Sequence, residues 1–128
     1  MTSQAHTAQI KHLTEFASET LFGATITRLL SRERLPAVGF DHVRIPQGAT
    51  LEPHIHEAAA SFIYILAGAA VVTLDGKPYP ARVGDTIYVP AGVSHGFSTP
   101  ETAVELLSVQ SPPIYPEDSA PDITFGPQ

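Results

Sequence analysis

The sequence predicts an all-β fold, a single-domain β-barrel or jelly roll of antiparallel strands. Short segments rich in branched and aromatic residues recur along the middle of the chain, and glycine, proline and Asp-Gly turns separate them. No segment in this region has the apolar period of an amphipathic helix. The length of 128 residues fits one domain with one hydrophobic core.

Turn residues delimit the expected strands. In chain order these strands are residues 25–30, 38–45, 61–67, 70–74, 77–82, 86–89, 95–97 and 102–109. Pro46 ends the second strand, and Asp75-Gly76 predicts a hairpin between the fourth and the fifth. Gly84 and Pro90 begin the turns before the later strands. This even spacing predicts that residues 23–110 form the barrel.

The two ends of the chain lack this pattern. We expect residues 1–22 to form an irregular N-terminal arm, in which Ile10, Leu13 and Phe16 recur at a spacing that permits a short helix. Residues 111–128 contain five of the twelve prolines, so this tail is not a central strand. We expect the tail to pack on the barrel surface, and a loosely ordered terminus is the alternative.

Composition excludes several classes of function. Thirteen acidic residues against seven basic ones give a net charge of -6, without a basic stripe, which argues against nucleic acid and anionic membranes as partners. The absence of cysteine excludes disulfides and thiolate chemistry, so any metal is held by nitrogen or oxygen. Neither a secretory signal nor a long apolar run is visible, and we expect a cytoplasmic protein.

Three of the six histidines have informative surroundings. His54 and His56 are two residues apart in an extended segment, so both rings are expected to point to the same side. His95 lies in a later strand, from which a third imidazole would complete a metal site. An isolated pair of this spacing is common by chance. The other histidines, His6, His12 and His42, have no such context, and we expect them at the surface or in ordinary hydrogen bonds.

The flanking residues resemble the two motifs of the cupin family. Gly48, five further residues and then His54-Ile55-His56 match the opening of the first motif, which continues to Gly68. Residues 84–95, ending in His95, match the second motif, with its glycines and proline at the family's spacing. The resemblance implies a cupin barrel, with one divalent metal ion bound to the three histidines.

The sequence departs from the family at one ligand position. Many cupins have a fourth ligand, a glutamate, where this chain has Ser61. A serine hydroxyl is a poor metal ligand but can hold a bound water. Glu57, Glu105 and Glu52 are carboxylates near the expected site, and one that lay close would serve as a general base. The candidate catalytic residues are therefore Ser61, Glu57 and Glu105.

Without a carboxylate ligand, the ion would keep its full charge and an open face. The resemblance therefore implies a metalloenzyme for a small anionic substrate that binds through two atoms, with an iron-dependent dioxygenase as the first expectation. Iron is favoured, while manganese, nickel, zinc and copper are also compatible with imidazole. A non-redox isomerase, lyase or cyclase is the alternative, as is a non-catalytic ligand-binding cupin. By analogy with small cupins, we expect a homodimer.

Overall fold

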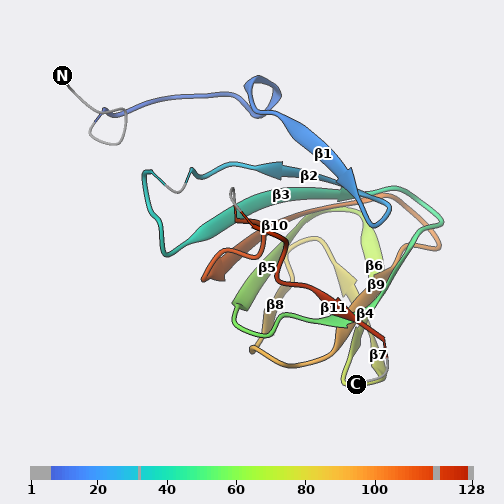
Figure 1. The fold of residues 1–128 in the computed structure, drawn as a ribbon. Helices are drawn as coiled ribbons and strands as arrows, with labels where there is room; N and C mark the ends of the chain where they lie inside the picture. The colour runs from blue at the N-terminus through green and yellow to red at the C-terminus, as the bar shows by residue number, and fades with distance from the viewer. Residues whose placement is uncertain (1–6, 32, 117–118, 127–128) are drawn as a thin grey trace.

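The computed structural model describes residues 7–31, 33–116 and 119–126, and these form two antiparallel sheets (Figure 1). The first sheet has the order β1-β2-β3-β10-β5-β8, and the second has the order β11-β4-β9-β6-β7. The strands are β1 Ser18–Leu21, β2 Ala24–Arg28, β3 Gly39–Ile45, β4 Thr50–Ile55, β5 Ala60–Ala67, β6 Ala69–Leu74, β7 Lys77–Arg82, β8 Thr86–Val89, β9 His95–Ser98, β10 Val104–Ser111 and β11 Thr124–Phe125. The all-β prediction of a jelly-roll barrel is confirmed.

The predicted strands differ from the observed ones mainly at their ends. β7 and β8 have the predicted bounds, whereas β10 begins and ends two residues later than predicted. β1 forms within the segment that we expected as an arm, because it pairs with β2 across the tight turn at Phe22 and Gly23. A short 3-10 helix, η2 Leu13–Glu15, lies in the same arm. No helix in the described residues is long and apolar enough to cross a membrane.

The core lies between the two sheets and follows from strand alternation. In β5, Ser61, Ile63 and Ile65 are buried, whereas Phe62 and Tyr64 are exposed on the opposite face, as alternation predicts. The buried core cluster consists of Ala24, Ile26, Val43, Ile45, Ile63, Ile65, Ala70, Val72, Ala81, Ile87, Val89, Phe97, Val104 and Leu106. These side chains hold the sheets together by burying apolar surface.

One irregularity in β4 sets the direction of the histidines. Leu51 pairs with Phe97 and His54 pairs with His95, so three residues advance on β4 while two advance on β9. The extra residue is a bulge, and it places both Leu51 and His54 toward the interior despite their odd spacing. Gly96 on β9 makes room for the bulge, because a Cβ there would lie 2.8 Å from the carbonyl oxygen of Leu51.

The proline-rich tail packs on the barrel. Ile114 is buried, and β11 pairs with β4 so that Thr124 faces Ile55 and Phe125 faces His54 (Figure 1). The side chain of Phe125 also lies 5.0 Å from the ring of Phe22, measured between centroids. The tail therefore reaches the strand that carries the first histidine.

The outer face of the first sheet carries exposed aromatic side chains. Phe62 on β5 and Tyr88 on β8 are register partners with ring centroids 4.8 Å apart, and Tyr64 is exposed beside them. The homodimer stays a prediction. In such a dimer, a second copy of the chain would cover this apolar face.

Candidate metal centre

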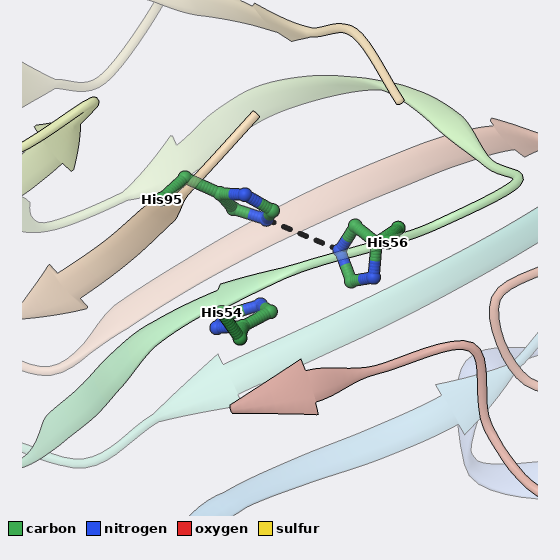
Figure 2. A group of neighbouring side chains, drawn as sticks. All are labelled: His54, His56 and His95. Atoms are coloured by element: carbon green, nitrogen blue, oxygen red, sulfur yellow. Dashed lines mark hydrogen bonds between the residues drawn. The ribbon is translucent and has the colours of Figure 1, made fainter. Parts of the chain in front are cut away.

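The structure brings His54, His56 and His95 together inside the barrel (Figure 2). His54 is on β4, His56 follows that strand directly, and His95 is the first residue of the neighbouring strand β9. One ring nitrogen from each residue forms a group in which all lie within 4.8 Å of one another. Among the described residues, no carboxylate belongs to this group.

Each of the three rings is oriented by a backbone carbonyl. The Nδ1–H of His54 donates to the carbonyl oxygen of Glu52 at 2.7 Å, and that of His95 donates to Val93 at 2.9 Å. The Nδ1–H of His56 donates to the carbonyl oxygen of Asp122 at 2.6 Å. Because a carbonyl accepts only from a protonated nitrogen, these bonds place the proton of each neutral ring on Nδ1 and leave Nε2 with a free lone pair. Histidines that bind metals are commonly fixed in this way.

Two of the Nε2 atoms fit a shared cation. Nε2 of His56 and Nε2 of His95 are 3.1 Å apart, the contact drawn as a dashed line in Figure 2. A hydrogen bond here needs a second proton on one ring, which would make that ring a buried cation. Two nitrogens that each lie about 2.0–2.1 Å from one ion, at about a right angle, have nearly this separation. The chemistry and spacing of these donors therefore suit a divalent metal ion.

Burial keeps the three rings neutral. All three histidines are at most 5% exposed. Burial lowers the pKa of His54 and of His56 below the usual range. Burial, together with the neighbouring His54, lowers the pKa of His95 to about 3. Neutral imidazole is the form that binds a metal.

The metal-free protein is expected to lose stability as the pH falls from 7.5 to 5. Unfolding returns each histidine to a pKa near 6.5. Below that pH the unfolded chain therefore binds protons at these rings and the folded chain does not, so acid favours the unfolded state. Each ring that stays neutral in the folded state costs about 1.4 kcal/mol per pH unit below that value. Asp41 has the opposite effect on stability, because its pKa is raised to about 6 in the folded protein. As the pH falls, the folded state binds at most one proton there that the unfolded state does not. Urea unfolding with a chelator at several pH values measures the slope, and a curve that is flat or rises toward acid would contradict the expectation.

The three histidines line an internal cavity with a volume of about 60 Å³. Its other lining residues are mostly apolar and come from both sheets and the tail: Leu21, Phe22, Ala24, Ile26, Asp41, Val43, Ile45, Leu51, Ser61, Ile63, Phe97, Leu106, Ser108, Ile114 and Tyr115. The Oγ of Ser61 is buried and has no hydrogen-bond partner in the described structure. An unsatisfied hydroxyl beside a metal-type site is a ready donor to a bound ligand.

The predicted carboxylates lie elsewhere. Glu57 is exposed, and Thr124 lies 3.5 Å from its carboxylate. Glu105 lies 3.5 Å from His42. Glu52 is exposed because the bulge in β4 breaks the alternation that gave it the face of His54. None of the three lines the cavity, whereas Ser61 does.

His12 and His42 have partners outside the metal centre. His12 accepts a hydrogen bond from the backbone of Thr14 and caps η2, and His42 faces Glu105. His6 lies outside the described residues.

Asp122 is a residue of the site that the sequence did not reveal. Its backbone carbonyl accepts from His56, and its carboxylate accepts from the N–H groups of Glu57, Ala58 and Ala59 at 2.8, 3.0 and 3.0 Å. Burial alone would raise the pKa of Asp122, but these three donors outweigh it and lower the pKa. Asp122 therefore fixes both a ligand and the turn that follows it.

Gly92 of the second motif is hydrogen-bonded to His56 of the first motif. Gly92 has a φ of 80°, which favours glycine, and its N–H donates to the carbonyl oxygen of His56 at 2.8 Å. The turn that precedes His95 is thereby tied to the ligand on the other strand.

Comparison with protein families gives a match to the cupin domain over residues 41–110. Among curated proteins, the chain is 30% identical over 76 residues to the uncharacterized protein MJ1618 of Methanocaldococcus jannaschii, covering 59% of this chain and 61% of that protein. It is 39% identical over 49 residues to the dimethylsulfoniopropionate lyase DddW of Ruegeria pomeroyi, covering 38% of this chain and 32% of the lyase. Each match thus spans less than two thirds of the relative's length.

Among solved structures, the chain is similar to a predicted oxalate decarboxylase from Thermotoga maritima. The TM-score is 0.74 at 26% identity, with 80% of this chain and 98% of the other covered. The likeness extends over nearly the whole of that small protein.

Proposed function

Because this chain belongs to the cupin family, we propose that it is a metal-dependent enzyme that acts on a small organic anion. The observation that carries the proposal is the set of three buried, neutral imidazoles, each with its Nδ1–H bonded to a backbone carbonyl and its Nε2 free. Each ring already presents an unprotonated nitrogen in an orientation fixed by a backbone carbonyl, which favours a dedicated site over a fortuitous cluster.

The surroundings of the site support a small anionic substrate. No carboxylate from the described chain joins the three histidines, so the positive charge of an ion there would be neutralised by the substrate. The mostly apolar cavity lining limits the polar contacts to a few positions, among them the unpaired hydroxyl of Ser61. A compact molecule with two oxygen donors, such as a hydroxy acid, keto acid or diol, fits these conditions.

Non-redox chemistry is our leading candidate. A bound divalent ion supplies Lewis-acid polarisation of a coordinated oxygen. Ser61 would donate a hydrogen bond to the substrate, and the apolar walls would exclude bulk water. The names of two relatives support this choice, since one is a lyase and the other a predicted decarboxylase.

An iron-dependent dioxygenase is the second candidate. The observation that favours it is the same lack of a carboxylate ligand, which leaves positions free for both a substrate and oxygen. Iron remains the metal favoured for this version.

Metal reconstitution and oxygen uptake test both versions. The chelator-treated protein is loaded separately with iron, manganese, nickel, zinc and copper, and each form is assayed on small hydroxy acids, keto acids and diols with and without oxygen. Turnover under argon supports the non-redox version, whereas turnover that requires iron and consumes oxygen supports the dioxygenase. A reconstituted protein that holds no stoichiometric metal would refute both and favour a non-catalytic binding protein.

Replacing Ser61 with alanine is expected to leave the metal-free protein as stable or up to about 1 kcal/mol more stable, because the change removes an unsatisfied buried hydroxyl. Binding of oxalate to the metal-loaded protein is expected to weaken by about 5–10-fold, the worth of one hydrogen bond. Urea unfolding and calorimetric titration measure the two effects.

Ser108→Ala is the matched control for this prediction. Its hydroxyl lines the same cavity but accepts a hydrogen bond from Gln110 at 2.8 Å, so its loss is expected to destabilise the protein. If Ser61→Ala destabilises as much as Ser108→Ala and leaves oxalate affinity unchanged, the role given to Ser61 is wrong.

A further inference from the structure

A buried carboxylate lines the same cavity as the three histidines. Asp41 is on β3 in the first sheet, whereas the three histidines belong to β4, β9 and the residue after β4 in the second sheet. Asp41 is 3% exposed. Burying a carboxylate in a largely apolar cavity is costly, so its position calls for a functional or structural reason.

The hydrogen bonds of Asp41 use only one of its two oxygens. Its Oδ2 accepts from Nε2 of Gln110 at 2.8 Å. Gln110 is itself fixed, because its Nε2 also donates to Ser108 and its Oε1 accepts from the N–H of Ile114. No hydrogen bond reaches Oδ1 of Asp41 within the described part of the chain. One oxygen is therefore held in place and the other is available to a ligand.

The charged and titratable groups around Asp41 leave its pKa close to neutral pH. Arg28 on β2 is its register partner and is also paired with Glu19, and Tyr115 approaches from the segment after β10. Burial raises the pKa of Asp41 to about 6, against the hydrogen bond from Gln110 and the charge of Arg28. Both protonation states are thus accessible near neutral pH, which is the property of an efficient proton carrier.

Asp41 also has a route to solvent. Together with Tyr115 it also lines a second hollow, which includes Arg28, Phe40 and Gln110 and is partly open to solvent. A proton accepted inside the cavity can leave on this side.

We propose that Asp41 is the general acid–base group of the enzyme, an inference that rests on the metal-dependent function proposed above. Oδ1 of Asp41 takes the proton of a substrate hydroxyl as the substrate binds. The O–H bond of the substrate breaks, its electron pair stays on the substrate oxygen, and an O–H bond forms at Oδ1. The reverse transfer neutralises the product and restores the carboxylate, so no other reactant is consumed.

Counting protons on ligand binding tests this role without an assay of turnover. Catechol, a neutral diol, is titrated calorimetrically into the zinc-loaded protein in two buffers of different ionisation enthalpy, at pH 7.5 and at pH 5. At pH 7.5 the wild-type protein is expected to release about one proton fewer than Asp41→Asn, because the carboxylate retains it. At pH 5 the two proteins are expected to release equal numbers, because Asp41 is already protonated.

The controls separate the possible failures. Asp75→Asn makes the same change at an exposed turn residue with positive φ, a conformation that asparagine tolerates, and should behave as the wild type. If Asp41→Asn does not fold, Asp41→Ser takes its place. Equal proton counts at pH 7.5, with catechol bound to both proteins, would overturn the role of Asp41 alone. Catechol binding that is absent, or unchanged by removal of zinc, would overturn the proposed function and this inference with it.

Discussion

Replacing His95 with alanine will remove stoichiometric metal from the protein and abolish the stabilisation that metal confers. Each histidine supplies one of only three nitrogens in the group, and the described chain has no carboxylate there to replace a lost ligand. Loss of a residue that merely orients a metal ligand commonly weakens binding by about 10–100-fold, so loss of the ligand itself should exceed about 100-fold. Elemental analysis after reconstitution measures the occupancy.

Thermal unfolding provides the second measurement for this variant. A ligand present at about 100 times its dissociation constant stabilises a folded protein by about 2.7 kcal/mol, so metal should raise the unfolding temperature of the wild type. His95→Ala should show no such rise. His42→Ala is the matched control, because that histidine is on β3 and faces Glu105 outside the cavity. Full metal occupancy in His95→Ala would refute the three-histidine site.

Replacing Asp122 with alanine is expected to weaken metal binding by about 10–100-fold, although this residue is not a ligand. The carboxylate holds the N–H groups of the turn after His56, and the backbone of the same residue holds the ring of His56. Releasing the turn should free the tail and let the ring rotate. The loss of these hydrogen bonds should also reduce the free energy of unfolding by about 1–3 kcal/mol.

A control with similar chemistry separates positioning from general stability. The carboxylate of Asp85 also accepts a backbone N–H, that of Arg82 at 2.8 Å, but it lies in the turn between β7 and β8. Asp85→Ala should lower stability without changing metal affinity, as measured by competition with a chromophoric chelator. If both variants leave metal affinity unchanged, Asp122 is structural only.

Much of the fold could be predicted because alternation and turn chemistry act locally. β7 and β8 have the predicted bounds since Gly76 and Gly84 fix the turns before them. The convergence of the three histidines was also predictable, because the two-residue spacing of His54 and His56 sets their common direction and the second motif supplies His95.

The parts that could not be predicted depend on contacts between distant segments. His56 and Asp122 are 66 residues apart, and the tail has no periodic pattern that indicates which of its residues meets the site. The outward facing of Glu52 depends on the bulge in β4, and a bulge leaves no clear signal in composition. Asp41 did have a signal, since it shares strand parity with the buried residues Val43 and Ile45, and a lone acidic residue on an inward face marks a candidate site.

The bulge in β4 separates the number of residues before His54 from the direction in which its ring points. Three positions of β4 span the interval that two positions of β9 span, and Glu52 and Pro53 occupy the surplus. Deleting one of them would restore a regular ladder, in which Leu51 and the first histidine are two positions apart and both still face the interior. A shortened gene of this kind would still direct all three histidines to the cavity, so a motif search among relatives should accept either length of this interval.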